Sequence, residues 1–176
     1  MKAVLLAGGT GTRLFPLTKV VNKQLLLVGK LPMIVHGIEK LKDAGLVDIL
    51  IITGVSSAGL LIQLLGSGRA WDVSLTYRIQ EEAGGIAHAL ALAEGYAGSG
   101  ERFALMLGDN LFENSLKGHV QNFFLKQREG ARVLLKEVPD PARYGVPEFE
   151  GNRIVRIDEK TRLPQVKLLC YGILPL

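Results

Sequence analysis

The chain has 176 residues, 48% of them hydrophobic and 22% charged, which suits one domain with a sizeable core and excludes a disordered tail. The net charge of +4 comes without any basic run interleaved with aromatic residues, and aromatics make up 6% of the chain, so nucleic acid is not expected as a partner. No apolar run approaches the ~18 residues of a membrane span, so no membrane association is expected either.

The cysteine content and the first residues of the chain bear on its compartment. Cys170 is the single cysteine, so no internal disulfide can form, and a reducing setting is expected. Residues 1–7 lack the basic flank, the longer apolar stretch and the cleavage site of a signal peptide. Together these features predict a cytoplasmic protein.

Strand and helix patterns alternate along the chain. Apolar or alternating runs predict strands at residues 2–7, 48–53, 73–79, 103–107 and 131–138. Helical spacing, or richness in alanine, predicts helices at residues 32–43, 60–65, 85–94 and 116–128. This alternation favours an α/β fold, a three-layer sandwich around a mostly parallel sheet. Ligands bind such sheets beyond the carboxyl ends of the strands, which here means after Ala7, Ile79 and Leu107.

A glycine-rich turn, LAGGTGTRL at residues 6–14, follows the first predicted strand. Gly8, Gly9 and Gly11 allow backbone amides to approach a phosphate chain closely, and Arg13 adds a cation with a geometry suited to phosphate oxygens. No Gly-Lys-Ser/Thr follows, so the turn is not a Walker loop. Leu14 stands where a dinucleotide fingerprint has its third glycine, and no acidic residue lies about twenty residues on. The alternative is an ordinary strand-to-helix glycine turn.

Seven motifs, in order from residue 1 to residue 160, resemble those of the glucose-1-phosphate thymidylyltransferases, a family of sugar-1-phosphate nucleotidyltransferases. They are GGTGTRL at 8–14, KQLL at 23–26, PMI at 32–34, Gln80 with GGIA at 84–87, LGDN at 107–110, RYGV at 143–146 and EK at 159–160. The resemblance implies a Rossmann-like nucleotidyltransferase fold. It also implies that a sugar phosphate oxygen attacks the α-phosphorus of a nucleoside triphosphate in line and releases pyrophosphate. Complete members of the family are expected to be homo-oligomers.

The resemblance implies a set of nucleotide-binding and catalytic residues. The nucleotide-binding residues would be Gly8, Gly9, Thr10, Gly11, Thr12, Arg13, Gln24, Gln80 and Gly85. The two glutamines would read the edge of a pyrimidine, because a primary amide offers both a donor and an acceptor. Arg13, Lys23 and Asp109 would be catalytic, with Asp109 as a Mg²⁺ ligand. The alternatives are a solvated surface position for Lys23 and for either glutamine alone, and a helix-capping role for Asp109.

The sugar phosphate would be bound by a second set of residues, again as the resemblance implies. These are Leu107, Tyr144, Gly145, Glu159 and Lys160. Tyr144 and Gly145 would border the sugar pocket, Glu159 would accept hydrogen bonds from sugar hydroxyls, and Lys160 would pair with the phosphate. For Glu159 and Lys160 an exposed charged turn is the alternative.

The chain departs from the family pattern at several places. Leu27 stands where proline is usual, and His88 stands where glutamine is frequent; His88 is expected to pack on a helix rather than to act as a base. After Lys160 the resemblance ends abruptly, and back-translation is compatible with a change of reading frame. We therefore predict a nucleotidyltransferase domain over residues 1–160 and an aberrant tail over 161–176. A chain ending there would lack a second metal aspartate and further strands, so instability and little turnover are expected.

Three other functions compete with transfer from dTTP to glucose-1-phosphate. Transfer from UTP is the nearest, because thymine and uracil differ by one methyl group, which a pocket discriminates by only ~1–3 kcal/mol. A non-catalytic nucleotide-binding fragment is an alternative of another class. A nicotinamide-dependent dehydrogenase is disfavoured because the ribose-binding acidic residue is missing.

Overall fold

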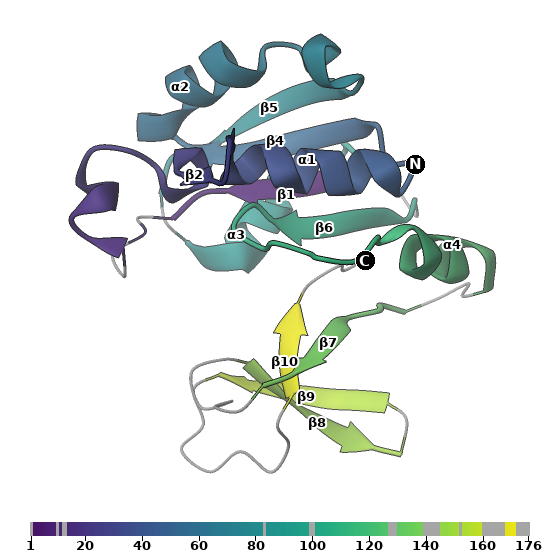
Figure 1. The fold of residues 1–176 in the computed structure, drawn as a ribbon. Coiled ribbons are helices and arrows are strands. Elements are labelled where there is room, and N and C mark those ends of the chain that lie inside the picture. Colours follow the sequence, from purple (N-terminus) through teal and green to yellow (C-terminus); the bar gives the residue numbers. More distant parts are fainter. Residues whose placement is uncertain are drawn as a thin grey trace. The chain divides into compact units, whose positions relative to one another are not determined.

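The computed structural model describes residues 2–9, 11, 14–82, 84–98, 101–126, 130–138, 145–151, 153–159 and 168–171. These residues form two compact units, one comprising the described residues up to Gly130 and the other those from Ala131 onward (Figure 1).

A four-stranded parallel sheet forms the centre of the first unit. Its strands lie in the order β5 (Ser74–Gln80), β4 (Asp48–Gly54), β1 (Lys2–Ala7) and β6 (Phe103–Leu107) (Figure 1). β1 pairs with β4 on one side and β6 on the other, both in parallel. Residues 3–7 and 49–53 of the two inner strands are buried, and all of them except Thr53 are apolar, as expected for strands covered on both faces. The predicted parallel sheet is confirmed.

Helices cover both faces of this sheet. On one face α1 (Met33–Asp43) brings Gly37 close to the side chains of Leu5 and Met106. On the other face Val4 and Leu6 pack with residues of α3 (Gly85–Ala91) and of the turns after it. The alternation of side chains along β1 therefore feeds two separate apolar layers, and the three-layer arrangement is confirmed. Two further helices, α2 (Val55–Leu65) and α4 (Lys117–Lys126), follow β4 and β6.

Helix boundaries differ from the predicted ones where glycine interrupts the pattern. α2 begins at Val55, five residues before the predicted start, because Gly59 breaks the apolar spacing without breaking the helix. α3 ends at Ala91 rather than at residue 94. α1 agrees closely with the predicted bounds, and its residues Ile34, Ile38 and Leu41 are fully buried.

Between β1 and α1 lie two 3-10 turns, η2 (Leu17–Lys19) and η3 (Lys23–Leu25), and a hairpin of β2 (Leu27–Val28) and β3 (Leu31–Pro32).

The second unit is built from antiparallel pairs. β8 (Gly145–Glu150) pairs with β9 (Arg153–Glu159), with a register irregularity between Glu148 and Phe149. β7 (Leu134–Glu137) pairs with β10 (Leu168–Tyr171). The strand predicted at 131–138 therefore exists in shortened form but does not join the parallel sheet. β10 falls within the predicted aberrant tail, whose residues 161–167 and 172–176 lie outside the described residues, and the change of reading frame stays a prediction.

Within the described ranges, the helices are too short or too polar to traverse a lipid bilayer.

Candidate functional site

A cavity of about 330 Å³ opens at the carboxyl ends of β1, β5 and β6, where the sequence predicted ligand binding. It is lined by Leu6, Gly8, Gly9, Lys23, Gln24, Gln80, Gly85, Ile86, Ala89, Leu107 and Asp109. A second cavity of about 310 Å³ shares Gly8, Gly9 and Gln80 with the first and reaches the start of α2. Predicted nucleotide-binding and catalytic residues from four separate segments thus meet around one space.

Two glycines of the turn that borders this cavity occupy positions that restrict a side chain. Gly9 has a φ of +98°, a region that side chains disfavour. At Gly8 the constraint is space, because a Cβ there would lie 3.2 Å from Oε1 of Gln80. The turn therefore presents bare backbone to the cavity, as close approach to a ligand requires.

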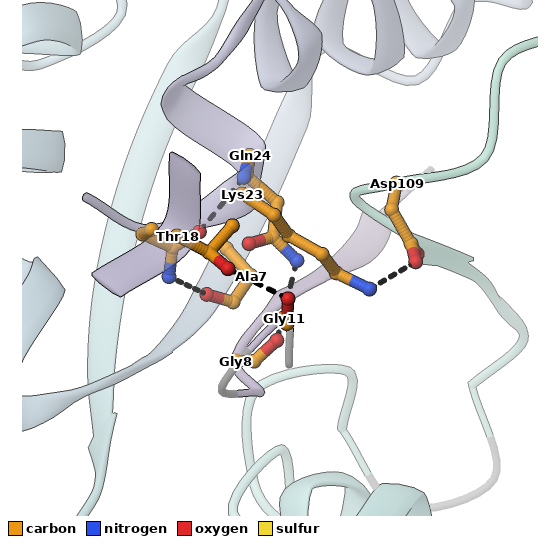
Figure 2. Close-up of polar contacts among 8 residues, drawn as sticks. Ala7, Gly8, Gly11, Thr18, Lys23, Gln24 and Asp109 are labelled. Carbon is orange, nitrogen blue, oxygen red and sulfur yellow. Dashed lines mark hydrogen bonds and ion pairs between the residues drawn. The ribbon is translucent and has the colours of Figure 1, made fainter. Parts of the chain in front are cut away.

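The side chain of Thr18 contacts the glycine turn at Gly11. Its Oγ1 donates a hydrogen bond of 2.7 Å to the carbonyl oxygen of Gly11 (Figure 2). Gly11 has a φ of +61°, and a Cβ there would approach Thr18 Cγ2 to 2.9 Å and Lys23 Cβ to 3.3 Å. Gly11 is thus held against both residues. Sequence reasoning missed Thr18, whose signal was a polar residue in a mostly apolar segment after the turn.

The side chain of Asn22 forms hydrogen bonds to three segments of the chain. Sequence reasoning also missed this residue. Its Nδ2 donates to the carbonyl oxygen of Ala7 at 3.1 Å and to Oγ of Ser57 in α2 at 2.8 Å. Its Oδ1 accepts from the backbone N–H of Gln24 at 2.8 Å and so caps η3. An asparagine directly before the KQ motif is a recognisable capping signal.

Gln24 lies beneath the glycine turn with 1% of its surface exposed. Its Nε2 donates a hydrogen bond of 3.2 Å to the carbonyl oxygen of Gly8 (Figure 2). A Cβ at Gly108 would lie 3.2 Å from Gln24 Cγ, so the following turn also confines the side chain. Its Oε1 is buried and has no hydrogen-bond partner among the described residues. An unpaired buried acceptor costs about 1–3 kcal/mol, so a donor from a ligand would relieve it.

Lys23 and Asp109 form an ion pair across the cavity, from Nζ to Oδ2 (Figure 2). Their side chains are 23% and 33% exposed, so Lys23 is not the solvated surface lysine that one interpretation allowed. Asp109 follows β6 in a turn held by a hydrogen bond from Gly108 N–H to the Leu6 carbonyl. It does not cap the next helix, because Ser115 Oγ accepts from Lys117 N–H at the start of α4.

Gln80, at the end of β5, contacts the first turn of α3. Its Nε2 lies 3.3 Å from the carbonyl oxygen of Gly85 and 3.4 Å from Nδ1 of His88. Gly85 has a φ of +83°. His88, which was expected to pack on a helix, is exposed on α3 and contacts a predicted base-reading side chain.

Asp109 contributes a carboxylate to the lining of the cavity, and this group suits a metal ion carried by a phosphate. Mg²⁺ is often bound through one or two carboxylates together with substrate phosphates and water, and Asp109 offers such an oxygen donor. The described residues contain no cluster of three or more His, Cys, Asp or Glu side chains that could hold a metal without a substrate. The residues therefore fit a phosphate-bound Mg²⁺ and not a complete protein cage.

The remaining predicted residues are placed only in part. Thr10, Thr12, Arg13, Tyr144 and Lys160 lie outside the described residues. Leu107 lines the cavity of the first unit. Gly145 and Glu159 belong to the second unit, where they are cross-strand partners at the open end of the β8–β9 hairpin.

The sequence model of the nucleotidyl transferase family matches residues 2–173 of the chain. A glucose-1-phosphate thymidylyltransferase of Streptomyces antibioticus is 37% identical over 174 residues, which cover 98% of this chain and 48% of that protein. One of Neisseria meningitidis is 39% identical over 174 residues, or 98% of this chain and 60% of that protein. The chain thus spans about half to three-fifths of the length of these curated relatives.

Solved structures show the same fold. A Bacillus anthracis protein provisionally assigned as a glucose-1-phosphate thymidylyltransferase, in complex with sucrose, matches with a TM-score of 0.93 and 47% identity over 99% of this chain and 70% of that one. A UDP-glucose pyrophosphorylase complexed with UDP-glucose matches with a TM-score of 0.82 and 26% identity, covering 99% of this chain and 75% of that one.

Proposed function

This chain belongs to the nucleotidyl transferase family, and on that premise we propose that it transfers the thymidylyl group of dTTP to glucose-1-phosphate, giving dTDP-glucose and pyrophosphate. The observation that carries the proposal is the cavity at the carboxyl edge of the sheet. It joins a bare glycine turn, a lysine–aspartate pair and two glutamine amides. These are the groups that a triphosphate, its metal and a pyrimidine need.

The glycine turn and Gln24 would hold the nucleotide. Gly8 and Gly9 expose backbone to the cavity, and backbone amides in such turns bind phosphate oxygens. Gln24 fixes the turn through the Gly8 carbonyl and keeps its buried Oε1 available for a donor on the nucleoside. Arg13, which lies outside the described residues, is proposed as a further phosphate contact because it follows this turn in the sequence.

Lys23 and Asp109 would exchange partners when the substrate arrives. In the structure each neutralises the other. Asp109 would bind Mg²⁺ carried by the triphosphate, and Lys23 would turn to the phosphate oxygens that then become its nearest negative charges. Bound Mg²⁺ would neutralise charge on the phosphates.

The reaction itself needs positioning more than covalent chemistry. An oxygen of the glucose-1-phosphate phosphate attacks the α-phosphorus of dTTP, forming a new P–O bond. The bond from the α-phosphorus to the bridging oxygen breaks, and pyrophosphate leaves with both electrons. Lys23 stabilises the charge that builds up on the phosphate oxygens, which is the largest contribution that such a site makes.

The sugar side of the site is proposed from fewer observations. Leu107 lines the cavity at the end of β6. Gly145 and Glu159 stay candidates from the second unit, and Tyr144 and Lys160 stay candidates by their place in the sequence. A homo-oligomeric state and a cytoplasmic location are likewise proposals.

Transfer from UTP is a second candidate, because a UDP-glucose pyrophosphorylase shares the fold at 26% identity. The curated thymidylyltransferases of Streptomyces antibioticus and Neisseria meningitidis are more similar, at 37% and 39% identity, and favour dTTP. Side-by-side turnover with dTTP and UTP distinguishes the two.

The test measures binding and turnover separately. Binding is read from the rise in melting temperature with dTTP, and turnover from pyrophosphate release with dTTP, Mg²⁺ and glucose-1-phosphate. Release that requires all three reactants supports the proposal. A rise in melting temperature without any pyrophosphate release favours the nucleotide-binding fragment. If dTTP causes no rise in melting temperature and no pyrophosphate is released, the transfer function and the binding function are both overturned.

A further inference from the structure

His88 has no place in the proposed chemistry, yet it contacts the side chain proposed to read the base. Its Nδ1 lies 3.4 Å from Nε2 of Gln80, and the same Nε2 donates to the carbonyl oxygen of Gly85 at 3.3 Å. A primary amide nitrogen carries two hydrogens. When His88 is the tautomer with its proton on Nε2, its Nδ1 accepts, so both hydrogens of Gln80 Nε2 have acceptors on α3 and its Oε1 is left for other partners.

The oxygen of that amide lies on the cavity side. A Cβ added to Gly8 would come within 3.2 Å of Gln80 Oε1, and Gly8 and Gln80 both line the cavity. If the amide turned over, Oε1 would face the Gly85 carbonyl and the unprotonated His88 Nδ1. Two acceptors would then oppose an acceptor, and both hydrogen bonds would be lost. With that tautomer of His88, the surroundings favour the observed orientation of the amide.

The imidazole of His88 can occupy its position because Gly84 has no side chain. A Cβ at Gly84 would lie 2.2 Å from His88 Nδ1 and 2.6 Å from its Cγ. The ring thus occupies the space above Gly84. The backbone of Gly84 has a φ of −80°, which alanine tolerates, so the reason for glycine here is the ring and not the backbone.

We propose that His88 is a positioning residue that locks the Gln80 amide with its oxygen toward the cavity, and that this lock selects an imide base over cytosine. The inference rests on the proposed function, since it assumes that Gln80 meets the base. Thymine and uracil present an N–H at ring position 3, which a carbonyl oxygen accepts. Cytosine presents a lone pair at the same position, and a fixed acceptor repels it.

Three substitutions test the lock by different routes. His88→Leu removes the acceptor, and His88→Gln replaces it with an amide oxygen that can accept the same hydrogen bond. Gly84→Ala keeps the histidine but fills the space of its ring. His119→Leu, on the exposed face of α4, is the matched control. Because His88 is exposed, its replacement leaves the core intact, and circular dichroism checks the fold of each variant.

The readout is the ratio of the dissociation constants for dCTP and dTTP, measured by calorimetry on the full chain. We expect His88→Leu and Gly84→Ala to lower this ratio about three- to ten-fold, the effect of one neutral hydrogen bond. His88→Gln should restore the ratio, and His119→Leu should leave it unchanged. In the pyrophosphate assay the loss should fall on KM for dTTP rather than on kcat, because the lock acts on the base and not on the reacting phosphates.

Each result decides the matter. An unchanged ratio in folded His88→Leu and Gly84→Ala overturns the lock, and so does a failure of His88→Gln to restore it. A wild-type chain that binds dTTP and dCTP equally well also overturns it. If the wild type prefers dTTP and the variants lose that preference, but no pyrophosphate is ever released, the lock stands and the transfer function fails. If dTTP does not bind at all, both fail.

Discussion

Two lysine–aspartate pairs lie at opposite edges of the same parallel sheet. Lys42 and Asp72 meet at 2.7 Å at the amino edge, where Asp72 is 81% exposed. Lys23 and Asp109 meet at the carboxyl edge, where the side chains are 23% and 33% exposed and line a cavity. The residue types are identical, but the second pair is less exposed than the first, in which Lys42 is 40% exposed, and only the second pair lines this cavity.

Some other polar groups at the two edges differ in a similar way, although Trp71 Nε1, next to Asp72 at the amino edge, is also buried without a partner among the described residues. At the amino edge Lys2 donates to the Tyr96 carbonyl at 2.6 Å, and the Tyr96 hydroxyl donates to Asp48 at 2.7 Å. At the carboxyl edge Gln24 Oε1 is buried without a partner among the described residues. A group that satisfies another group of the protein contributes to stability, whereas one left unpaired in a cavity is available to a ligand.

The largest effect that the comparison predicts comes from neutralising the carboxyl-edge pair. Lys23→Met and Asp109→Asn should each lower kcat/KM for pyrophosphate release by about a hundred-fold or more. The first removes the cation proposed to stabilise the reacting phosphates, and the second removes the carboxylate proposed to bind the phosphate-bound Mg²⁺. Steady-state kinetics with dTTP and glucose-1-phosphate measure this.

The amino-edge pair supplies the matched control for that experiment. Lys42→Met and Asp72→Asn remove the same charges from the same residue types, and kcat/KM should stay within about two-fold of the wild type, because exposed pairs contribute little. Equal losses from both pairs would mean that net charge, rather than position at the carboxyl edge, governs the rate.

The second prediction concerns the unpaired oxygen of Gln24. Gln24→Leu keeps the approximate size of the side chain but removes the buried acceptor, so the free energy of unfolding of the ligand-free chain should stay within about 1 kcal/mol of the wild type or rise. The dissociation constant for dTTP should rise about ten-fold, the effect of one lost hydrogen bond to a buried group. Chemical denaturation and calorimetry measure the two quantities.

That prediction fails in a specific way if Gln24 serves only the fold. Its Nε2 supports the Gly8 carbonyl, so a purely structural role would lower the free energy of unfolding and leave the affinity for dTTP nearly unchanged in the chain that remains folded. Lys136→Leu in β7, a polar-to-leucine change in the second unit, is the matched control.

The sequence predicted most of the carboxyl edge because its features are local. Strand-like runs ending at Ala7, Ile79 and Leu107 indicate where the chain turns, and parallel pairing then brings those turns to one edge. Gly8 could be singled out because it lies in the glycine turn after the first strand, and Asp109 because it follows a buried strand. Lys23 could be singled out only through the resemblance of its KQLL motif to the family. Their meeting around one cavity follows from the topology.

What the sequence could not predict depends on contacts between distant segments. Thr18 and Asn22 act through backbone carbonyls of Gly11 and Ala7, and a carbonyl acceptor leaves no mark in the side-chain pattern. The contact of His88 with Gln80 requires the exact turn between β5 and α3. The pairing of β7 with β10 was missed for a similar reason, since an antiparallel partner more than thirty residues away is not encoded in the apolar pattern of either strand.

The smallest predicted effect belongs to the amino edge, where Tyr96→Phe removes the hydroxyl that donates to Asp48. We expect the free energy of unfolding to fall by about 1 kcal/mol near neutral pH, with the affinity for dTTP unchanged. Burial, and next the hydrogen bond to Asp48, raise the pKa of Tyr96 above its ordinary value of 10.0. Below pH 10 the phenol is protonated in the folded and unfolded states, so the contribution is fully present there.

As the pH rises above 10, the unfolded chain loses this proton first while the folded chain retains it, so the stability that Tyr96 contributes declines. The wild type and Tyr96→Phe should therefore converge in free energy of unfolding as denaturation is repeated between pH 8 and about pH 11. Tyr77, whose pKa burial also raises, is common to both proteins and cancels in the difference. A gap that stays constant over this range would show that the Tyr96 hydroxyl contributes by packing alone. A loss of dTTP affinity in Tyr96→Phe would break the division between a stabilising edge and a binding edge.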